Sequence, residues 1–261
     1  MCYYKYLQGV KSMRILTIGD SWTYGAESSD PKTMSWPAQL ANKYDVEVVN
    51  LAQPGSSNKR QIRMCFEELA RDQNFDYIIY PLVPGARTEL LKNGKWQQVW
   101  PANTGKTKTE LDKLITEYWH PWNDVQDIIL QCFSFINTVG NFRIKLFVTG
   151  LSFKPLKYTT EINWIEDYKN DNNFESLGIP LDELNIGIKD LDRKLRTLKA
   201  LHHCNLHSQP EYFTDVVDLY LKDPAVVRKY GGELFAKEWH PNDAGYTALA
   251  DYFANKIGLT K

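Results

Sequence analysis

The sequence predicts an α/β protein: a three-layer α/β/α sandwich with a central parallel sheet. Short apolar segments alternate with longer segments of helical spacing along the 261 residues. The short segments are almost wholly apolar, which is typical of parallel strands covered by helices on both faces. With 43% hydrophobic and 24% charged residues, the chain has the composition of a globular protein with a full core. In such sheets ligands bind at the carboxyl ends of the strands.

Each element follows from its local pattern. Four strands are expected, at 15–18, 46–52, 76–83 and 144–151. Two helices are expected between them, at 36–44 and 58–72, the second with apolar residues at helical spacing (Ile62, Cys65, Phe66 and Leu69). A last helix is expected to begin at Pro241, because proline suits the first helical position. Its apolar stripe is Tyr246, Leu249, Ala250, Phe253 and Ile257.

The alternation indicates a single domain over residues 13–261 with two elaborated loops. Met13 directly precedes the first strand, so residues 1–12 are expected to be a leader that the fold does not need. The loops, at about 84–125 and 152–187, leave from the carboxyl ends of predicted strands. Lids and substrate walls commonly grow there, so both loops are expected to flank the site.

Charge and cysteine content exclude several classes of protein. A net charge of -1 gives no electrostatic reason for binding nucleic acid or an anionic membrane. The four cysteines lie far apart, which argues against a zinc ribbon or a redox pair. No apolar run reaches the ~18 residues needed to span a bilayer, and no secretory signal is present, so a cytoplasmic protein is expected. The histidines of "HHCNLH" (202–207) fit a polar helix end better than a metal site, and neither a metal nor a cofactor is expected.

The segment "ILTIGDSWTYG" (15–25) places a serine where the first strand ends. A tight strand-to-helix turn would expose the hydroxyl of Ser21, and Gly19 and Gly25 permit such a turn. Three interpretations remain open from this motif: a nucleophile, a plain turn, or a phosphate site at a helix N-terminus.

Two further motifs bear on that choice. "NLAQPGSSN" (50–58) brings Gly55 to the end of the second strand, where its N–H could face the same pocket, and Ser57 or Asn58 could cap the next helix. "EWHPNDAGY" (238–246) places His240 just before a packed helix, where it could act as a general base.

Together these motifs resemble the SGNH (GDSL-type) serine hydrolases, in order and spacing, over almost the whole chain from Met13. The resemblance implies a flavodoxin-like α/β/α sandwich. It also implies that Ser21 is the nucleophile and His240 the base, with the N–H groups of Ser21 and Gly55 holding the oxyanion.

Two departures from the family pattern concern catalysis. Val83 stands where the family has an asparagine that donates to the oxyanion, and Arg87 or Asn58 is the expected replacement. Lys237 stands where the family has the aspartate of D-x-x-H. An adjacent lysine would lower the basicity of the histidine, and Glu238 is expected to orient His240 instead.

The expected function is a serine esterase that removes an acyl group from a carbohydrate or similar small polar ester through an acyl-serine. Asp20, Asn58 and Arg87 are expected around the substrate, and Trp22 and Trp239 either line the cleft or pack in the core. The alternative is a non-catalytic binding module for a sugar or acylated ligand, because two helper residues are missing. The sequence predicts neither the acyl group nor the oligomeric state.

Overall fold

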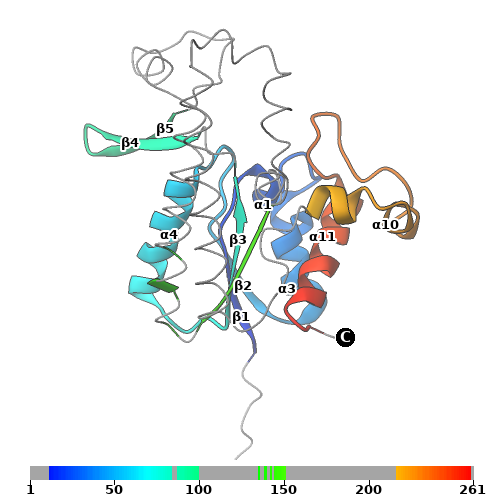
Figure 1. Ribbon diagram of the computed structural model, residues 1–261, viewed down its shortest axis with the longest axis horizontal. Helices are drawn as coiled ribbons and strands as arrows, with labels where there is room; N and C mark the ends of the chain where they lie inside the picture. The colour runs from blue at the N-terminus through cyan, green and yellow to red at the C-terminus, as the bar shows by residue number, and fades with distance from the viewer. Residues whose placement is uncertain are drawn as a thin grey trace, which may run out of the picture.

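The computed structural model describes residues 12–83, 87–99, 144–150 and 216–259, with 135, 138, 139 and 142 (Figure 1). Several expectations concern residues outside this part of the chain: the leader, the 152–187 loop and the histidine cluster at 202–207.

The central sheet has four parallel strands in the order β2-β1-β3-β6. These are the strands that the sequence predicts: β1 (Arg14–Thr17), β2 (Glu47–Asn50), β3 (Tyr77–Leu82) and β6 (Lys145–Gly150). β1 lies between β2 and β3, so the chain passes to one side of β1 and then to the other. The carboxyl ends of β1 and β3 therefore meet at a topological switch point, where open α/β sheets bind ligands.

Both faces of the sheet are buried, because alternate residues of each strand enter different cores. Ile15 of β1 and Ile79 of β3 pack with the C-terminal helix on one face. Leu16 and Ile78, their neighbours, pack on the other face with α4. This explains why the strands are apolar throughout instead of alternating.

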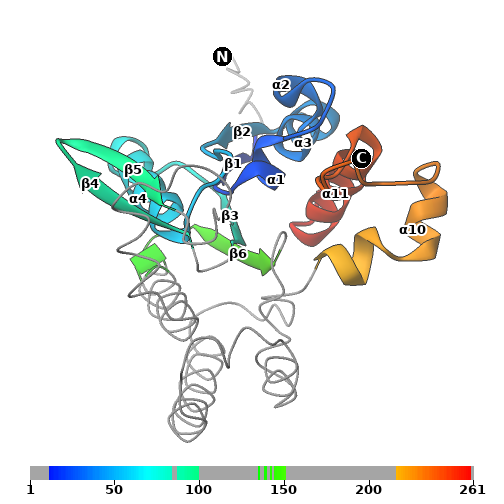
Figure 2. The ribbon, with the colours of Figure 1, turned by 90° about the horizontal axis from the view of Figure 1, so that it is seen from above.

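Helices cover the two faces as a three-layer sandwich (Figures 1 and 2). One side holds α1 (Ser21–Tyr24), α2 (Pro31–Met34), α3 (Trp36–Tyr44) and α11 (Asp243–Lys256), and the other holds α4 (Asn58–Arg71). A π-helical segment, η2 (Val217–Leu221), and α10 (Pro224–Lys229) precede the last helix. Within the described part of the chain, no helix has the length and apolarity required to cross a bilayer.

The start of α11 differs from the expectation. Asn242 is the N-cap, its side chain accepting the N–H of Gly245 at 2.9 Å, so Pro241 lies outside the helix. Proline at this position instead joins an isolated β-bridge with Phe235. The predicted apolar stripe is confirmed: Tyr246, Leu249, Ala250, Phe253 and Ile257 are all buried.

A two-stranded hairpin, β4 (Thr88–Lys92) and β5 (Lys95–Val99), forms the described part of the first loop. The sequence predicted an elaborated loop here and no strands. Asn93 and Gly94 form the turn with positive φ angles, the conformation that two-residue hairpin turns favour. Glu89 binds Arg63 of α4 through both carboxylate oxygens, at 2.8 and 3.0 Å. This pair secures the hairpin to α4. Figure 1 shows the hairpin beside that helix.

Candidate active site

The loop that carries Ser21 follows β1 directly, at the carboxyl edge of the sheet. Asp20 is the N-cap of α1 and accepts the N–H of Trp22 at 3.0 Å. The short helix ends at Gly25, which has a left-handed φ of 99°. A Cβ at Gly19 would lie 2.1 Å from the Thr23 hydroxyl, so this turn requires glycine there. These contacts place Ser21 at the first position of α1.

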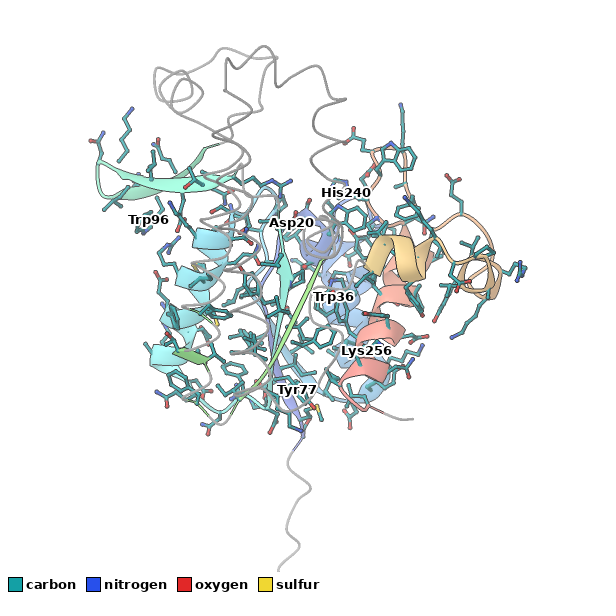
Figure 3. All side chains as sticks on the ribbon, viewed as in Figure 1. Asp20, Trp36, Tyr77, Trp96, His240 and Lys256 are labelled. Carbon is teal, nitrogen blue, oxygen red and sulfur yellow. The ribbon has the colours of Figure 1, made fainter. Side chains whose placement is uncertain are left out.

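The expected approach of His240 to Ser21 is confirmed. Its Nε2 lies 2.8 Å from the Ser21 Oγ, although the two residues are 219 positions apart. Figure 3 shows His240 and Asp20, the neighbour of Ser21, at the same end of the molecule, opposite Tyr77 at the start of β3. The side chain of His240 is 22% exposed, so its ring is largely shielded by the protein.

The group that orients His240 is Glu27, not Glu238 as the sequence suggested. The Glu27 Oε2 lies 2.9 Å from the Nδ1 of His240. Glu27 also accepts the backbone N–H of Glu238 at 3.1 Å and that of His240 at 3.2 Å. Glu238 thus contributes its backbone, while its side chain is exposed. The expectation failed because the turn around residue 238 directs the Glu238 N–H toward the Glu27 carboxylate, and it is Glu27 that contacts the histidine ring.

Contacts with two elements hold Glu27 in place. After Gly25 the chain folds back on α1, with the N–H of Ala26 donating to the Ser21 carbonyl at 2.9 Å. The hydroxyl of Tyr246, on α11, donates to the Ala26 carbonyl at 2.8 Å. The carboxylate therefore reaches His240 from a turn that is anchored both to α1 and to α11.

The environment of Glu27 favours its charged form. Desolvation is the largest single influence and raises the pKa, but the hydrogen bonds from Glu238 and His240 together outweigh it and hold the pKa below the usual range. The stabilising effect of this carboxylate is complete above its unfolded pKa and is lost as the pH falls through the lower, folded value. An ionised Glu27 can only accept a hydrogen bond, so the His240 Nδ1 carries the proton and its Nε2 can accept the Ser21 hydroxyl proton.

The loop that carries His240 is built from local hydrogen bonds. The N–H of Ala236 donates to the His240 carbonyl at 2.7 Å, and the N–H of Asn242 donates to the Leu234 carbonyl at 3.0 Å. A Cβ at Gly245 would lie 2.2 Å from that same Leu234 carbonyl oxygen, so only glycine lets α11 approach the loop this closely. His240 is therefore fixed by its own turn and by α11 behind it.

Asn58 lies in the interior and contacts the end of β3. It is 2% exposed, and its amide donates to the Val83 carbonyl at 2.8 Å. Its oxygen accepts the Val83 N–H at 3.1 Å and the Tyr80 hydroxyl at 3.0 Å. Both partners of the side-chain oxygen are protein groups, and the amide NH₂ already donates one hydrogen bond to Val83. A contact of this amide with substrate or oxyanion stays a prediction. Ser57, and not Asn58, is the helix N-cap.

Asp20 and Arg87 are paired with each other. The Arg87 guanidinium lies 2.7 Å from the Asp20 Oδ2, and the Asp20 side chain is 1% exposed. The Asp20 carboxylate is therefore buried beneath the loop surface and is not open to a substrate, which corrects that expectation. Arg87 remains 18% exposed and brings a positive charge next to the residue that precedes Ser21.

The two tryptophans of the motifs differ in exposure. Trp22 is partly buried, with its ring centroid 6.2 Å from that of Phe235 and 6.1 Å from that of His240. Trp239 is 73% exposed.

Gly55 has a left-handed φ of 74°, and its role as an oxyanion donor stays a prediction. In the described part of the chain, no group of three or more His, Cys, Asp or Glu side chains could hold a metal ion.

No family model matches the sequence, and no curated protein matches it. Among solved structures, the chain is similar to a protein assigned to the lipolytic G-D-S-L family from Desulfitobacterium hafniense, with 14% identity, a TM-score of 0.49, and 94% of this chain and 99% of that chain covered. It is also similar to a mutant acetylxylan esterase from Geobacillus stearothermophilus (14% identity, TM-score 0.49, 95% of each chain covered). A third is a psychrotrophic esterase from Pseudoalteromonas sp. (10% identity, TM-score 0.48, 94% and 96% covered).

One of these structures is named for the G-D-S-L group that the sequence motifs resemble, and the other two are named as esterases. At such identities and TM-scores, the function of this chain has to be argued from its own residues.

Proposed function

We propose that this protein is a serine esterase of the SGNH type that deacylates a carbohydrate or a similar small polar ester. The observation that carries the proposal is the continuous hydrogen-bonded chain from Ser21 Oγ through His240 to Glu27, with distances of 2.8 and 2.9 Å. A serine hydroxyl is a weak nucleophile until a neighbouring base takes its proton, and this arrangement supplies the base and the group that orients it.

The proposed reaction has two halves. Ser21 Oγ attacks the ester carbonyl while the His240 Nε2 takes the hydroxyl proton, and Glu27 stabilises the imidazolium that forms. As the tetrahedral intermediate collapses, the carbon–oxygen bond to the alcohol breaks and His240 gives its proton to the leaving oxygen. A water molecule, deprotonated by His240, then attacks the acyl-serine and releases the acid and the free serine.

The oxyanion of the intermediate needs donors, and the proposal assigns the backbone N–H groups of Ser21 and Gly55 to it. Val83 is fully buried and has no side-chain donor, so it cannot act there. Arg87, held beside Asp20, is the proposed source of additional positive charge near the intermediate. A binding module with the same fold is the second candidate function, favoured by that missing side-chain donor.

Labelling with a fluorophosphonate probe separates the two functions. The wild type is expected to acquire one covalent label, because an activated serine attacks the phosphorus, and Ser21→Ala is expected to acquire none. Mass spectrometry of the labelled peptide identifies the serine, and hydrolysis of small acetate esters by the wild type should disappear in Ser21→Ala. A wild type that neither labels nor hydrolyses any ester would favour the binding module.

Replacement of Arg87 tests its proposed contribution. Arg87→Met is expected to lower kcat/KM by about 10- to 100-fold. The variant loses part of the stabilisation of the oxyanion, and the loop that carries Asp20 and Ser21 loses the salt bridge that orders it. Arg87→Lys should recover part of the loss, since it keeps the charge. Steady-state kinetics on an acetate ester measure both.

Arg63→Met is the matched control, because Arg63 also pairs with a buried carboxylate, that of Glu89, whose side chain is 3% exposed. Both arginine-to-methionine variants leave a buried carboxylate without its salt-bridge partner, so both should lower the stability to urea. Only Arg87→Met should lower kcat/KM. Equal losses of kcat/KM in the two variants would mean that Arg87 contributes to stability and not to catalysis.

A further inference from the structure

Trp239 combines two features that are each uncommon for a tryptophan. Its backbone adopts the left-handed conformation, with a φ of 67°, and 73% of the residue is exposed to solvent. Four non-glycine residues in the described part of the chain have a positive φ: Glu27, Asp45, Asn93 and Trp239. Aspartate and asparagine adopt this conformation readily, whereas a bulky aromatic residue is strained in it.

The turn itself explains the left-handed conformation but not the tryptophan. The Trp239 N–H donates to the Ala236 carbonyl at 3.2 Å, and Phe235 and Pro241 pair across the base of the turn. Glycine would take this conformation without strain. Burial does not compensate for the strain, because most of the side chain is in contact with solvent. The residue at this position is thus unfavourable for stability, and strain of this kind is concentrated at functional sites.

The position of Trp239 relates it to the reaction. It directly precedes His240, and its ring centroid lies 6.4 Å from that of Phe235. Phe235 in turn contacts Trp22, which is the residue after Ser21. The exposed indole is therefore the outer member of an aromatic group, Trp22, Phe235 and Trp239, that adjoins both Ser21 and His240.

The direction of proton transfer assigns this side of the site to one part of the substrate. His240 has to reach the leaving oxygen to protonate it, so the alcohol portion of the ester lies on the histidine side. This step rests on the proposed function. An indole attached to the turn that carries His240 would accordingly contact the alcohol and not the acyl group.

We propose that Trp239 is the stacking platform for a pyranose ring in the alcohol portion of the substrate, and so determines specificity. A flat ring exposed on one side suits a sugar, which can place its C–H face on the indole while its hydroxyls remain in water. An acyl chain would gain less from such a surface, because its stabilisation grows with the apolar area removed from water on all sides. The retained strain is then explained by substrate recognition.

Kinetics with two substrates test the proposal. Acid release is measured from mono-O-acetylated methyl β-xylopyranoside and from ethyl acetate, which has the same acyl group and no ring. In Trp239→Ala and Trp239→Gly, the ratio of kcat/KM for the sugar ester to that for ethyl acetate is expected to fall by about 10-fold, mainly through KM for the sugar ester. Trp239→Gly should also raise Tm, because it removes the strain.

Trp96→Ala is the matched control. Trp96 is 49% exposed and lies on the hairpin, on the side of the molecule away from His240 (Figure 3). Its replacement removes an exposed indole of the same size, and the substrate ratio should remain that of the wild type. An unchanged ratio in both Trp239 variants would overturn the proposal.

A binding measurement keeps this inference separate from the proposed function. Saturation-transfer NMR detects methyl β-xylopyranoside bound to Ser21→Ala and to the double variant Ser21→Ala/Trp239→Ala. Saturation that is lost in the double variant supports the platform, even if the wild type cleaves no ester and the proposed function fails. Ester cleavage by the wild type, with equal saturation in both variants, would overturn the platform and leave the esterase in place.

Discussion

Glu27→Gln is expected to lower kcat on an acetate ester by about 10³- to 10⁴-fold, the range seen when the acid of a catalytic triad becomes an amide. The amide oxygen can still accept a hydrogen bond from the His240 Nδ1, but the negative charge that stabilises the imidazolium is gone. If the amide NH₂ faces the ring instead, it selects the tautomer whose Nε2 carries a proton and cannot act as the base. Steady-state kinetics from pH 5 to 9 measure the loss.

Glu238→Gln is the matched control for this experiment. Glu238 is separated from His240 by one residue, and its exposed side chain has the same length and charge as that of Glu27. Its backbone N–H, which donates to Glu27, is unaffected by the substitution. The kcat of Glu238→Gln should stay within about twofold of that of the wild type. A large loss in Glu238→Gln with none in Glu27→Gln would restore the assignment that the sequence suggested.

Asn58→Ala is expected to destabilise the fold by on the order of 3 kcal/mol. The substitution removes three hydrogen bonds in the interior, two with the backbone of Val83 and one with the Tyr80 hydroxyl. A buried polar group that loses its partner costs about 1–3 kcal/mol. Urea unfolding followed by circular dichroism measures the change in the free energy of unfolding.

Asn74→Ala provides the comparison, because Asn74 is exposed and its amide binds the nearby Asp72. The free energy of unfolding of Asn74→Ala should differ from that of the wild type by less than about 0.5 kcal/mol. The same experiment separates the two roles considered for Asn58. If Asn58→Ala unfolds like the wild type but has lost activity, the asparagine acts on the oxyanion after all.

The sequence by itself determined the features that local patterns encode. The runs of apolar residues specify strands buried on both faces, and helical spacing specifies α3, α4 and the buried stripe of α11. The glycines around Ser21 and the residues before α11 indicated where the chain turns tightly. The resemblance of three motifs to the SGNH hydrolases also implied that Ser21 and His240 would meet, and their 2.8 Å contact confirms the approach.

Only the tertiary structure decided which groups serve those two residues. Glu27 reaches His240 from 213 positions away, because α11 packs against the turn that follows α1. Asn58 binds the end of β3, and Arg87 binds Asp20 across 67 positions. Glu238, Asn58 and Asp20 were assigned from their distance along the chain, which does not specify the direction of a side chain. Such contacts depend on how neighbouring elements pack and on which polar groups the packing buries, and neither is encoded in a local pattern.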